Sequence, residues 1–292
     1  MTMALWVVEV NGRARLARGT IDSPSELLAE EETIDRVLGD ELADGLASAI
    51  SSPGAGNVPP NARILAPIGQ QDVWAAGVTY RRSRDARMSE SRSSNSYDRV
   101  YGAARPELFF KSTGARTRGP SETIGVRADS GWDVPEPELA VVVNRRARIV
   151  GYTIGNDVSS RRIEGENTLY LPQAKIYTDS CALGPCLVPI EDAPPLNEMT
   201  INLTVHRNGR TVYADEVHVA DMYRKIDDLV RWLYLAQDFP YGAVLMTGTA
   251  IVPDDNFTLR AGDSVSIAIT GLGVLMNPVE QVGGTAPPPV EK

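Results

Sequence analysis

Cysteine and histidine are scarce in this chain, whose 292 residues contain only two of each. Cys181 and Cys186 share one apolar stretch without a further cysteine or a histidine nearby. This spacing argues against a zinc site or a disulfide and predicts two small buried side chains in a reducing compartment. His206 and His218 fall in a segment with strand-like alternation, where we expect them to be solvated.

Long apolar runs and an excess of positive charge are also missing. No apolar run approaches the roughly 18 residues of a membrane-spanning helix, and the chain does not start with the basic and apolar segments of a signal peptide. We therefore expect a soluble, cytoplasmic protein. The formal net charge of -9 argues against a nucleic-acid partner and against binding to an anionic membrane surface.

Turn-forming residues divide the chain into three predicted parts. Hydrophobic residues make up 42% of the sequence, which is enough for a large core beside a smaller one. Residues 51–60 are rich in serine, glycine and proline, as is typical of a linker. We expect a small N-terminal domain with its linker over residues 1–60, the main domain over 61–282 and a flexible tail over 283–292.

The periodicity of apolar residues indicates many short strands and a few helices. In the N-terminal part we expect a strand over 4–10, a hairpin turn at Asn11-Gly12 and a helix within 24–50. Further on, the pattern predicts strands at 62–67, 72–78, 108–110, within 137–155, at 244–247 and at 264–270, a hairpin over 199–217, and helices within 82–103 and 219–236. Such a series indicates an α+β fold built on a sheet sandwich or roll.

Acidic residues of two neighbouring predicted strands form the clearest candidate site. Glu136 and Glu138 stand two residues apart at the start of an apolar run, so both would point to one face of a strand. Asp157 follows the next apolar segment and could join them if the two strands pair. Adjacent carboxylates are costly without a cation, and oxygen ligands select Mg²⁺, Mn²⁺ or Ca²⁺ over zinc. The spacing equally allows that the glutamates only cap an exposed strand end.

Four short motifs, taken together and in order, resemble those of the fumarylacetoacetate hydrolase family. They are Glu136-x-Glu138, Asp157-Val158-Ser159-Ser160-Arg161, Lys175 and Thr247-Gly248-Thr249. The resemblance implies a mixed β-sandwich roll that assembles into a homo-oligomer, either a dimer or a tetramer. It also implies that Glu136, Glu138 and Asp157 bind Mg²⁺, with Mn²⁺ or Ca²⁺ as alternatives.

Longer motifs resemble one branch of this family, the 2-keto-3-deoxy-D-arabinonate (D-xylonate) dehydratases. The branch is similar over nearly the whole chain, including a small N-terminal α/β domain. One departure from the family's hydrolases supports it, because Ser83 stands where they carry a catalytic histidine and a hydrolase would lack its base. The motifs are Gly77-Val78-Thr79-Tyr80-x-x-Ser83-Arg84, Val100-Tyr101-Gly102-Ala103-Ala104-Arg105-Pro106-Glu107-Leu108-Phe109-Phe110-Lys111, Tyr170-Leu171-Pro172-Gln173-Ala174-Lys175-Ile176-Tyr177 and Thr247-Gly248-Thr249-Ala250-Ile251-Val252-Pro253.

The resemblance implies an enzyme of pentose catabolism, a hydro-lyase acting on a small keto sugar acid. It would dehydrate 2-keto-3-deoxy-D-pentonate, derived from arabinonate or xylonate, to 2,5-dioxopentanoate (α-ketoglutarate semialdehyde). The metal would polarise the keto group and acidify the C3 proton. Loss of the C4 hydroxyl would then leave an enol that tautomerises to the aldehyde. This reaction needs a base near C3 and an acid near the C4 oxygen.

Lys175 and Glu107 are the candidate catalytic residues. Lys175 could be the base, because a lysine beside a cation in a dry pocket can have a lowered pKa. It could instead be a fixed cation that holds substrate oxygens. Glu107 could be the acid or a proton shuttle, or else a structural partner of Arg105 or Lys111. The sequence does not decide which of the two is base and which is acid, so the roles could be exchanged.

Two polar loops supply the candidate substrate-binding residues. Ser83 and Arg84 follow a predicted strand, and the Arg84 guanidinium could hold a carboxylate or hydroxyl. Thr249 could donate to the substrate carboxylate or only shape a turn. We expect Arg161 to pair with the acidic cluster and assign no role to Glu164. Three further arginines are expected to be solvated: Arg81, Arg82 and Arg87.

Two other functions remain compatible with the sequence. A hydrolase or decarboxylase of 2,4-diketo acids, acylpyruvate or oxaloacetate is the alternative within the family, and decarboxylation needs only the metal as electron sink. A non-catalytic protein that binds keto acids is the more distant alternative. It would keep the metal motif but would have no need for Lys175 and Glu107.

Overall fold

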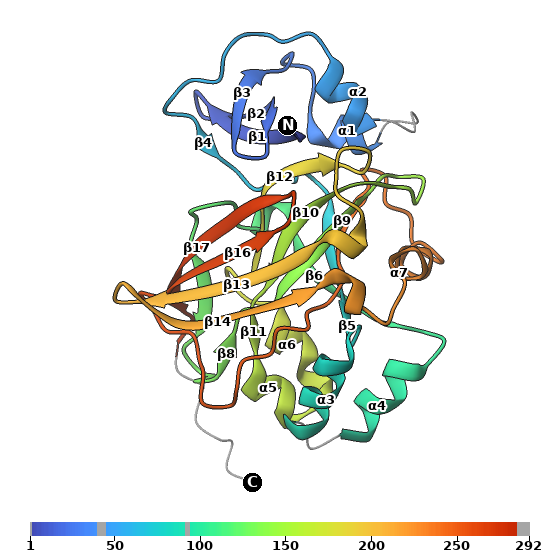
Figure 1. Cartoon of the computed structure of the whole chain (residues 1–292), viewed down its shortest axis with the longest axis vertical. Coiled ribbons are helices and arrows are strands. Elements are labelled where there is room, and N and C mark those ends of the chain that lie inside the picture. Colours follow the sequence, from blue (N-terminus) through green and yellow to red (C-terminus); the bar gives the residue numbers. More distant parts are fainter. Residues whose placement is uncertain (1, 40–44, 91–93, 285–292) are drawn as a thin grey trace.

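Two β-sheets that pack face to face form the centre of the molecule, and short helices lie at both ends of it (Figure 1). The computed structural model describes residues 2–39, 45–90 and 94–284. Side chains from both sheets share one large apolar core. The predicted α+β class with a mixed-sheet sandwich is therefore confirmed.

The larger sheet has ten strands and carries the candidate site. Its order is β3-β2-β1-β12-β10-β9-β15-β5-β6, and β4 pairs with β1. The central strands are buried along nearly their whole length, as expected for strands that are covered on both faces. The strands are β1 Met3–Val10, β2 Arg13–Thr20, β3 Ser23–Leu27, β4 Arg63–Ile64, β5 Asp72–Gly77, β6 Glu107–Thr113, β9 Pro137–Val143, β10 Ile149–Asp157, β12 Cys181–Pro189 and β15 Ala243–Met246.

The second sheet has five strands in the order β14-β13-β16-β17-β7. Alternate residues of β13 are buried, so one face of this sheet covers the core and the other meets solvent. The predicted hairpin is confirmed, with Asn208 and Gly209 both at positive φ in its turn. The strands are β7 Ile124–Arg127, β13 Thr200–Arg207, β14 Arg210–His218, β16 Ser264–Ile269 and β17 Gly273–Val282, and a separate pair is formed by β8 Asp133–Val134 and β11 Ser159–Ser160.

The N-terminal strands extend the larger sheet instead of standing apart from it. The turn at Asn11-Gly12 forms as predicted, and β1 reaches β12 through the pair Leu5 and Leu187. The core beneath β1 also contains Val142 and Leu187 from the main strands. The division of the chain at residue 60 thus stays a prediction. The predicted tail lies outside the described residues from position 285 onward.

The predicted helix within 24–50 was wrong at its start, because residues 23–27 form the edge strand β3. Pairing with β2 overrides the local pattern there, and Glu26 accepts from the Arg18 guanidinium across the two strands at 2.6 Å. Two short helices follow it. The helices of the molecule are α1 Ile34–Gly39, α2 Gly45–Ser51, α3 Arg81–Glu90, α4 Ser94–Gly102, α5 Arg161–Glu166, α6 Leu171–Lys175 and α7 Ile226–Leu233.

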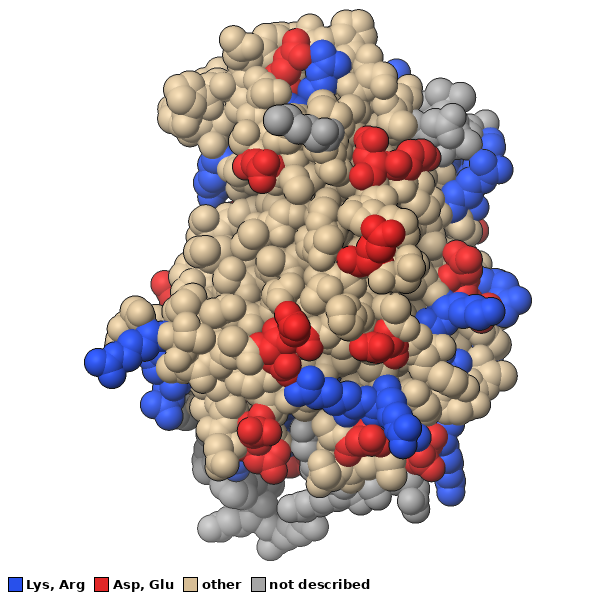
Figure 2. All heavy atoms as spheres, in the orientation of Figure 1, with Lys and Arg blue, Asp and Glu red and all other residues tan. Residues whose placement is uncertain are grey.

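The helix predicted over 219–236 is shorter than expected. Only α7 is α-helical, because the preceding residues are tied to the loop after β5. The Tyr223 N–H donates to the Thr79 carbonyl at 2.9 Å, and Met222 forms a β-bridge with Tyr80. Among the described residues, no helix is long and apolar enough to cross a membrane. On the face in Figure 2, acidic and basic side chains are intermixed.

The inward face of the second sheet predicts a measurable difference between two substitutions. Ile201 in β13 is fully buried, so Ile201→Ala should lower the free energy of unfolding by about 2–5 kcal/mol. Val212 in the neighbouring β14 is 41% exposed, and Val212→Ala should change it by about 0.5 kcal/mol or less. Urea unfolding followed by circular dichroism measures both. Equal losses would contradict the assignment of this face to the core.

Candidate metal and active site

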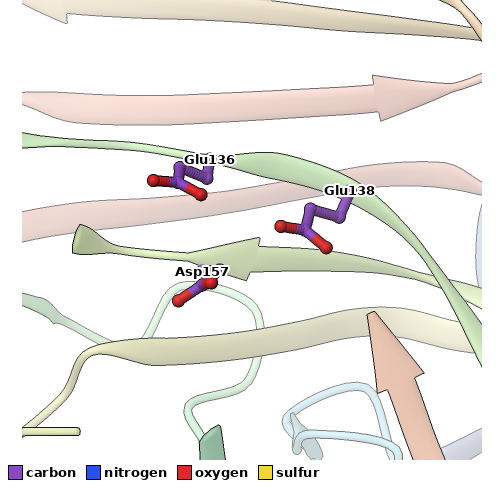
Figure 3. A group of neighbouring side chains, drawn as sticks. All are labelled: Glu136, Glu138 and Asp157. Carbon is purple, nitrogen blue, oxygen red and sulfur yellow. The ribbon is translucent and has the colours of Figure 1, made fainter. Parts of the chain in front are cut away.

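Three carboxylates meet where β9 and β10 run side by side. Glu136 precedes β9, Glu138 lies within it, and Asp157 ends β10. The Asp157 N–H donates to the Glu136 carbonyl at 3.0 Å, which fixes the register that brings them together. One oxygen from each lies within 4.8 Å of the others, and the side chains converge in Figure 3. The predicted acidic triad, Glu136, Glu138 and Asp157, is therefore present as a cluster.

The acidic triad is buried, so its charge is costly unless it is compensated. Burial alone would raise the pKa of Glu136, but the charges of Lys175 and Arg87 outweigh this effect and lower the pKa to about 2. Glu138 behaves differently, since burial and the charges of Asp157 and Glu136 raise its pKa well above the usual value. Its carboxylate accepts from the Gly248 N–H at 2.5 Å, and no ion pair to it occurs among the described residues. This uncompensated carboxylate, together with the all-oxygen donor set, fits a hard dication.

The Lys175 ammonium lies between two members of the triad. It donates to Glu136 Oε2 at 2.9 Å, to Asp157 Oδ2 at 3.1 Å and to Ser159 Oγ at 2.6 Å. Burial alone would lower the pKa of Lys175, but the charges of Asp157 and Glu136 outweigh it and raise that pKa. These contacts hold the lysine as a cation between the two carboxylates. Its role as a base stays a prediction.

Arg87 corrects one of the sequence predictions. We expected it to be solvated, but it is 7% exposed, and its guanidinium lies 2.9 Å from Glu136 Oε1 and 3.2 Å from Glu164 Oε1. Glu164, to which the sequence assigned no role, therefore forms an ion pair with Arg87, which also pairs with Glu136 of the triad. Ser83 and Arg87 are four residues apart and share the buried face of α3, but nothing in the polar sequence of this helix marks that face.

Arg161 pairs with the acidic cluster, as the sequence predicts. Its guanidinium lies 3.5 Å from Glu136 Oε1. The residue begins α5, whose N-terminus is capped by Ser160, which accepts from the Ile163 N–H at 3.3 Å. The cap fixes where the helix starts and so turns Arg161 towards Glu136.

Glu107 begins β6 and is partly buried. Its burial and the charge of Glu164 raise the pKa of Glu107 to about 7, against the lowering effect of Arg87 and Lys175. A side chain at Gly77 of the neighbouring strand β5 would collide with the Glu107 carboxylate, so the two lie in contact. A carboxyl group with this pKa can exchange a proton near neutral pH.

The alternative in which Glu107 is a structural ion-pair partner is not supported. Arg105 lies over the ring of Trp232, at 4.4 Å from its centroid. Lys111 lies 2.5 Å from Asp157 Oδ1. In the part of the chain that the structure describes, neither cation pairs with Glu107.

The Ser83 and Arg84 side chains make local contacts. Ser83 is buried, and its hydroxyl donates to the Tyr80 carbonyl at 2.8 Å. The Arg84 guanidinium donates to Asp85 at 2.7 Å and lies over the Tyr101 ring at 4.9 Å. Within the described residues, the acidic triad makes no ion pair with Arg84. Substrate binding by Ser83 and Arg84 stays a prediction.

Thr249 lies in the loop that follows β15. Its Oγ1 accepts from the Ile251 N–H at 3.1 Å and so shapes the turn. The adjacent Gly248 adopts φ +95° and gives its N–H to Glu138. A role of Thr249 in substrate binding likewise stays a prediction.

Lys111 is a site residue that sequence reasoning missed. Its side chain is fully buried at the end of an apolar strand segment, Leu108–Phe110, and contacts three oxygens. They are Asp157 Oδ1 at 2.5 Å, the Val158 carbonyl at 3.0 Å and the Lys175 carbonyl at 2.5 Å. A lysine directly after three apolar strand residues was the available signal.

Two curated proteins are similar to this chain over about three quarters of its length. The chain is 50% identical over 216 residues to a "Probable 2-keto-3-deoxyxylonate dehydratase" of Haloferax volcanii, covering 74% of each chain. It is 42% identical over 223 residues to the "2-dehydro-3-deoxy-D-arabinonate dehydratase" of Saccharolobus solfataricus, covering 75% of each.

A solved structure is similar over nearly the whole molecule. It is described as "2-keto-3-deoxy-D-arabinonate dehydratase complexed with magnesium and 2,5-dioxopentanoate" and matches with a TM-score of 0.82. The sequence identity is 34%, and the match covers 95% of this chain and 99% of that one. The model of the fumarylacetoacetate (FAA) hydrolase C-terminal domain matches residues 72–280. The chain therefore belongs to the fumarylacetoacetate hydrolase family.

Proposed function

We propose that this protein dehydrates 2-keto-3-deoxy-D-pentonate to 2,5-dioxopentanoate, with Mg²⁺ held by the acidic triad. The observation that carries the proposal is the similarity over 95% of the chain to a dehydratase that contains magnesium and 2,5-dioxopentanoate. Its physical counterpart here is a buried triad of carboxylates with a lysine in reach of two of them. When bound, the metal would draw charge onto the substrate's keto oxygen.

The chain's own residues would move the protons. To act as the base, Lys175 would first release its contacts to Glu136 and Asp157 and give up its own proton to solvent, and as a neutral amine it would then take the proton from C3. Glu107, with a pKa of about 7, could give a proton to the departing C4 hydroxyl. Arg87, Arg161 and Lys111 place positive charge beside the buried carboxylates of Glu136 and Asp157.

The hydrolase alternative is less well supported. Ser83 stands where the related hydrolases have their histidine, and its hydroxyl is held by the Tyr80 carbonyl. Both histidines of the chain, His206 and His218, are exposed on the β13–β14 hairpin. Decarboxylation of a 2,4-diketo acid needs no histidine and remains the second candidate. We further propose a cytoplasmic homodimer or tetramer, from the family resemblance alone.

The proposed reaction is tested by identifying the product. Purified protein with Mg²⁺ and 2-keto-3-deoxy-D-arabinonate should give the aldehyde signal of 2,5-dioxopentanoate in the NMR spectrum, and EDTA should abolish it. No turnover of this substrate would contradict the proposal. Oxaloacetate and acylpyruvates, assayed in parallel, would then show whether the site decarboxylates or hydrolyses instead.

Replacement of Lys175 should have opposite effects on turnover and on metal binding. Lys175→Met should lower kcat by about 100-fold or more, because a proton-transfer group is lost. It should also tighten Mg²⁺ binding, because no ammonium then competes for Glu136 Oε2 and Asp157 Oδ2. Isothermal titration calorimetry of metal-free protein measures the affinity. Lys225→Met, at an exposed lysine, is the control, and weaker metal binding by Lys175→Met would contradict the competition.

The pH dependence can decide whether Glu107 is the acid or the base. The pKa of Glu107 is raised to about 7, so the carboxyl is protonated below that pH and ionised above it. If Glu107 is the acid, kcat/KM should fall as the pH rises through this pKa. Glu107→Gln should then be about 100-fold less active, and its activity should no longer fall over this pH range. An activity that rises through the same pH range would assign Glu107 as the base and exchange the two roles.

A further inference from the structure

A lysine and an arginine each pair with one oxygen of a triad carboxylate. Lys111 lies at Asp157 Oδ1, and Arg87 lies at Glu136 Oε1. The remaining oxygens, Asp157 Oδ2 and Glu136 Oε2, both face the Lys175 ammonium. Each of these carboxylates therefore has one oxygen paired with Lys111 or Arg87 and the other oxygen paired with Lys175.

The Lys111 ammonium lies among three oxygens of the protein. It donates hydrogen bonds to the carbonyls of Val158 and Lys175 and forms an ion pair with Asp157 Oδ1. The side chain is fully buried, and its three neighbours belong to segments other than its own strand β6. Lys111 thus joins one carboxylate of the triad to the backbone of the candidate base.

The contact with the Lys175 carbonyl matters because α6 is only five residues long. A helix of this length has little stability of its own, and Lys175 is its last residue. The carbonyl accepts from Lys111 at 2.5 Å and from Ser180 Oγ at 2.9 Å. These two contacts hold the backbone from which the Lys175 side chain extends.

We propose that Lys111 is a positioning residue that presents Asp157 to the metal through Oδ2 alone and anchors the backbone of Lys175. The inference rests on the proposed metal site. It differs from a purely electrostatic role, in which Lys111 would only neutralise charge. The two roles predict opposite changes in metal affinity when Lys111 is removed. Loss of a nearby positive charge should strengthen cation binding, whereas loss of the orientation of a ligand should weaken it.

The sign of the change in metal affinity tests the proposal. Calorimetric titration of metal-free Lys111→Met with Mg²⁺ or Mn²⁺ should show binding about tenfold or more weaker than in the unchanged protein. Lys175→Met removes a cation from the same carboxylate and should bind more tightly. Lys225→Met makes the same substitution at an exposed site and should not change the affinity. Affinity that is unchanged or higher in Lys111→Met would overturn the proposal.

A second variant and a second readout keep the test independent of folding. Lys111→Arg keeps the charge but not the geometry, so metal binding should again weaken, and unchanged affinity would contradict positioning. With saturating metal, both variants should lose kcat while KM stays within about threefold, because Lys111 does not touch substrate.

The unchanged protein gives a test that needs no variant. In crystals with bound Mg²⁺, Asp157 Oδ1 should remain on Lys111 with Oδ2 as the ligand. A bidentate Asp157 that has left Lys111 would overturn the proposal. If the unchanged protein binds no metal at all, the proposed function fails, which is distinct from failure of the Lys111 inference.

Discussion

The mutual repulsion of three buried carboxylates is the constraint on which the arrangement around the site depends. Carboxylates within 4.8 Å of one another cannot all stay ionised without cations close by. The cations come from four elements: Lys111 from β6, Arg87 from α3, Arg161 from α5 and Lys175 from α6. Charge compensation therefore ties the helices at one end of the molecule to the centre of the larger sheet, as Figure 1 lets the reader follow.

The acidic triad could be predicted because its signal is local. Two glutamates with the period of a strand, followed by an aspartate after the next apolar segment, need only strand pairing to meet. Arg87 and Lys111 were missed because their partners lie far along the chain, at Glu164 and Asp157. A buried arginine in a polar helix has the same local sequence as a solvated one. Only the fold distinguishes them.

The same reasoning explains which elements were predicted. Hairpins with an Asn-Gly turn were predicted correctly, because that dipeptide favours the positive φ angles of the turn by itself. Strand β3 was not predicted, because its pairing with β2 decides it. Helix α7 was predicted but is shorter than expected, because the hydrogen bond to the Thr79 carbonyl ties the residues before it. Strand β17 contains Pro278 and was not expected, although it pairs with both β16 and β7.

The pairing of β1 with β12 has a consequence for the solubility of the fold. Strand β12 is apolar and fully buried, and β1 lies along the side of it that faces away from β10. An uncovered apolar strand edge is a template on which a second chain can add a strand. The N-terminal strands thus protect the larger sheet from edge-to-edge aggregation. The new edge is strand β3, whose residues are mostly polar.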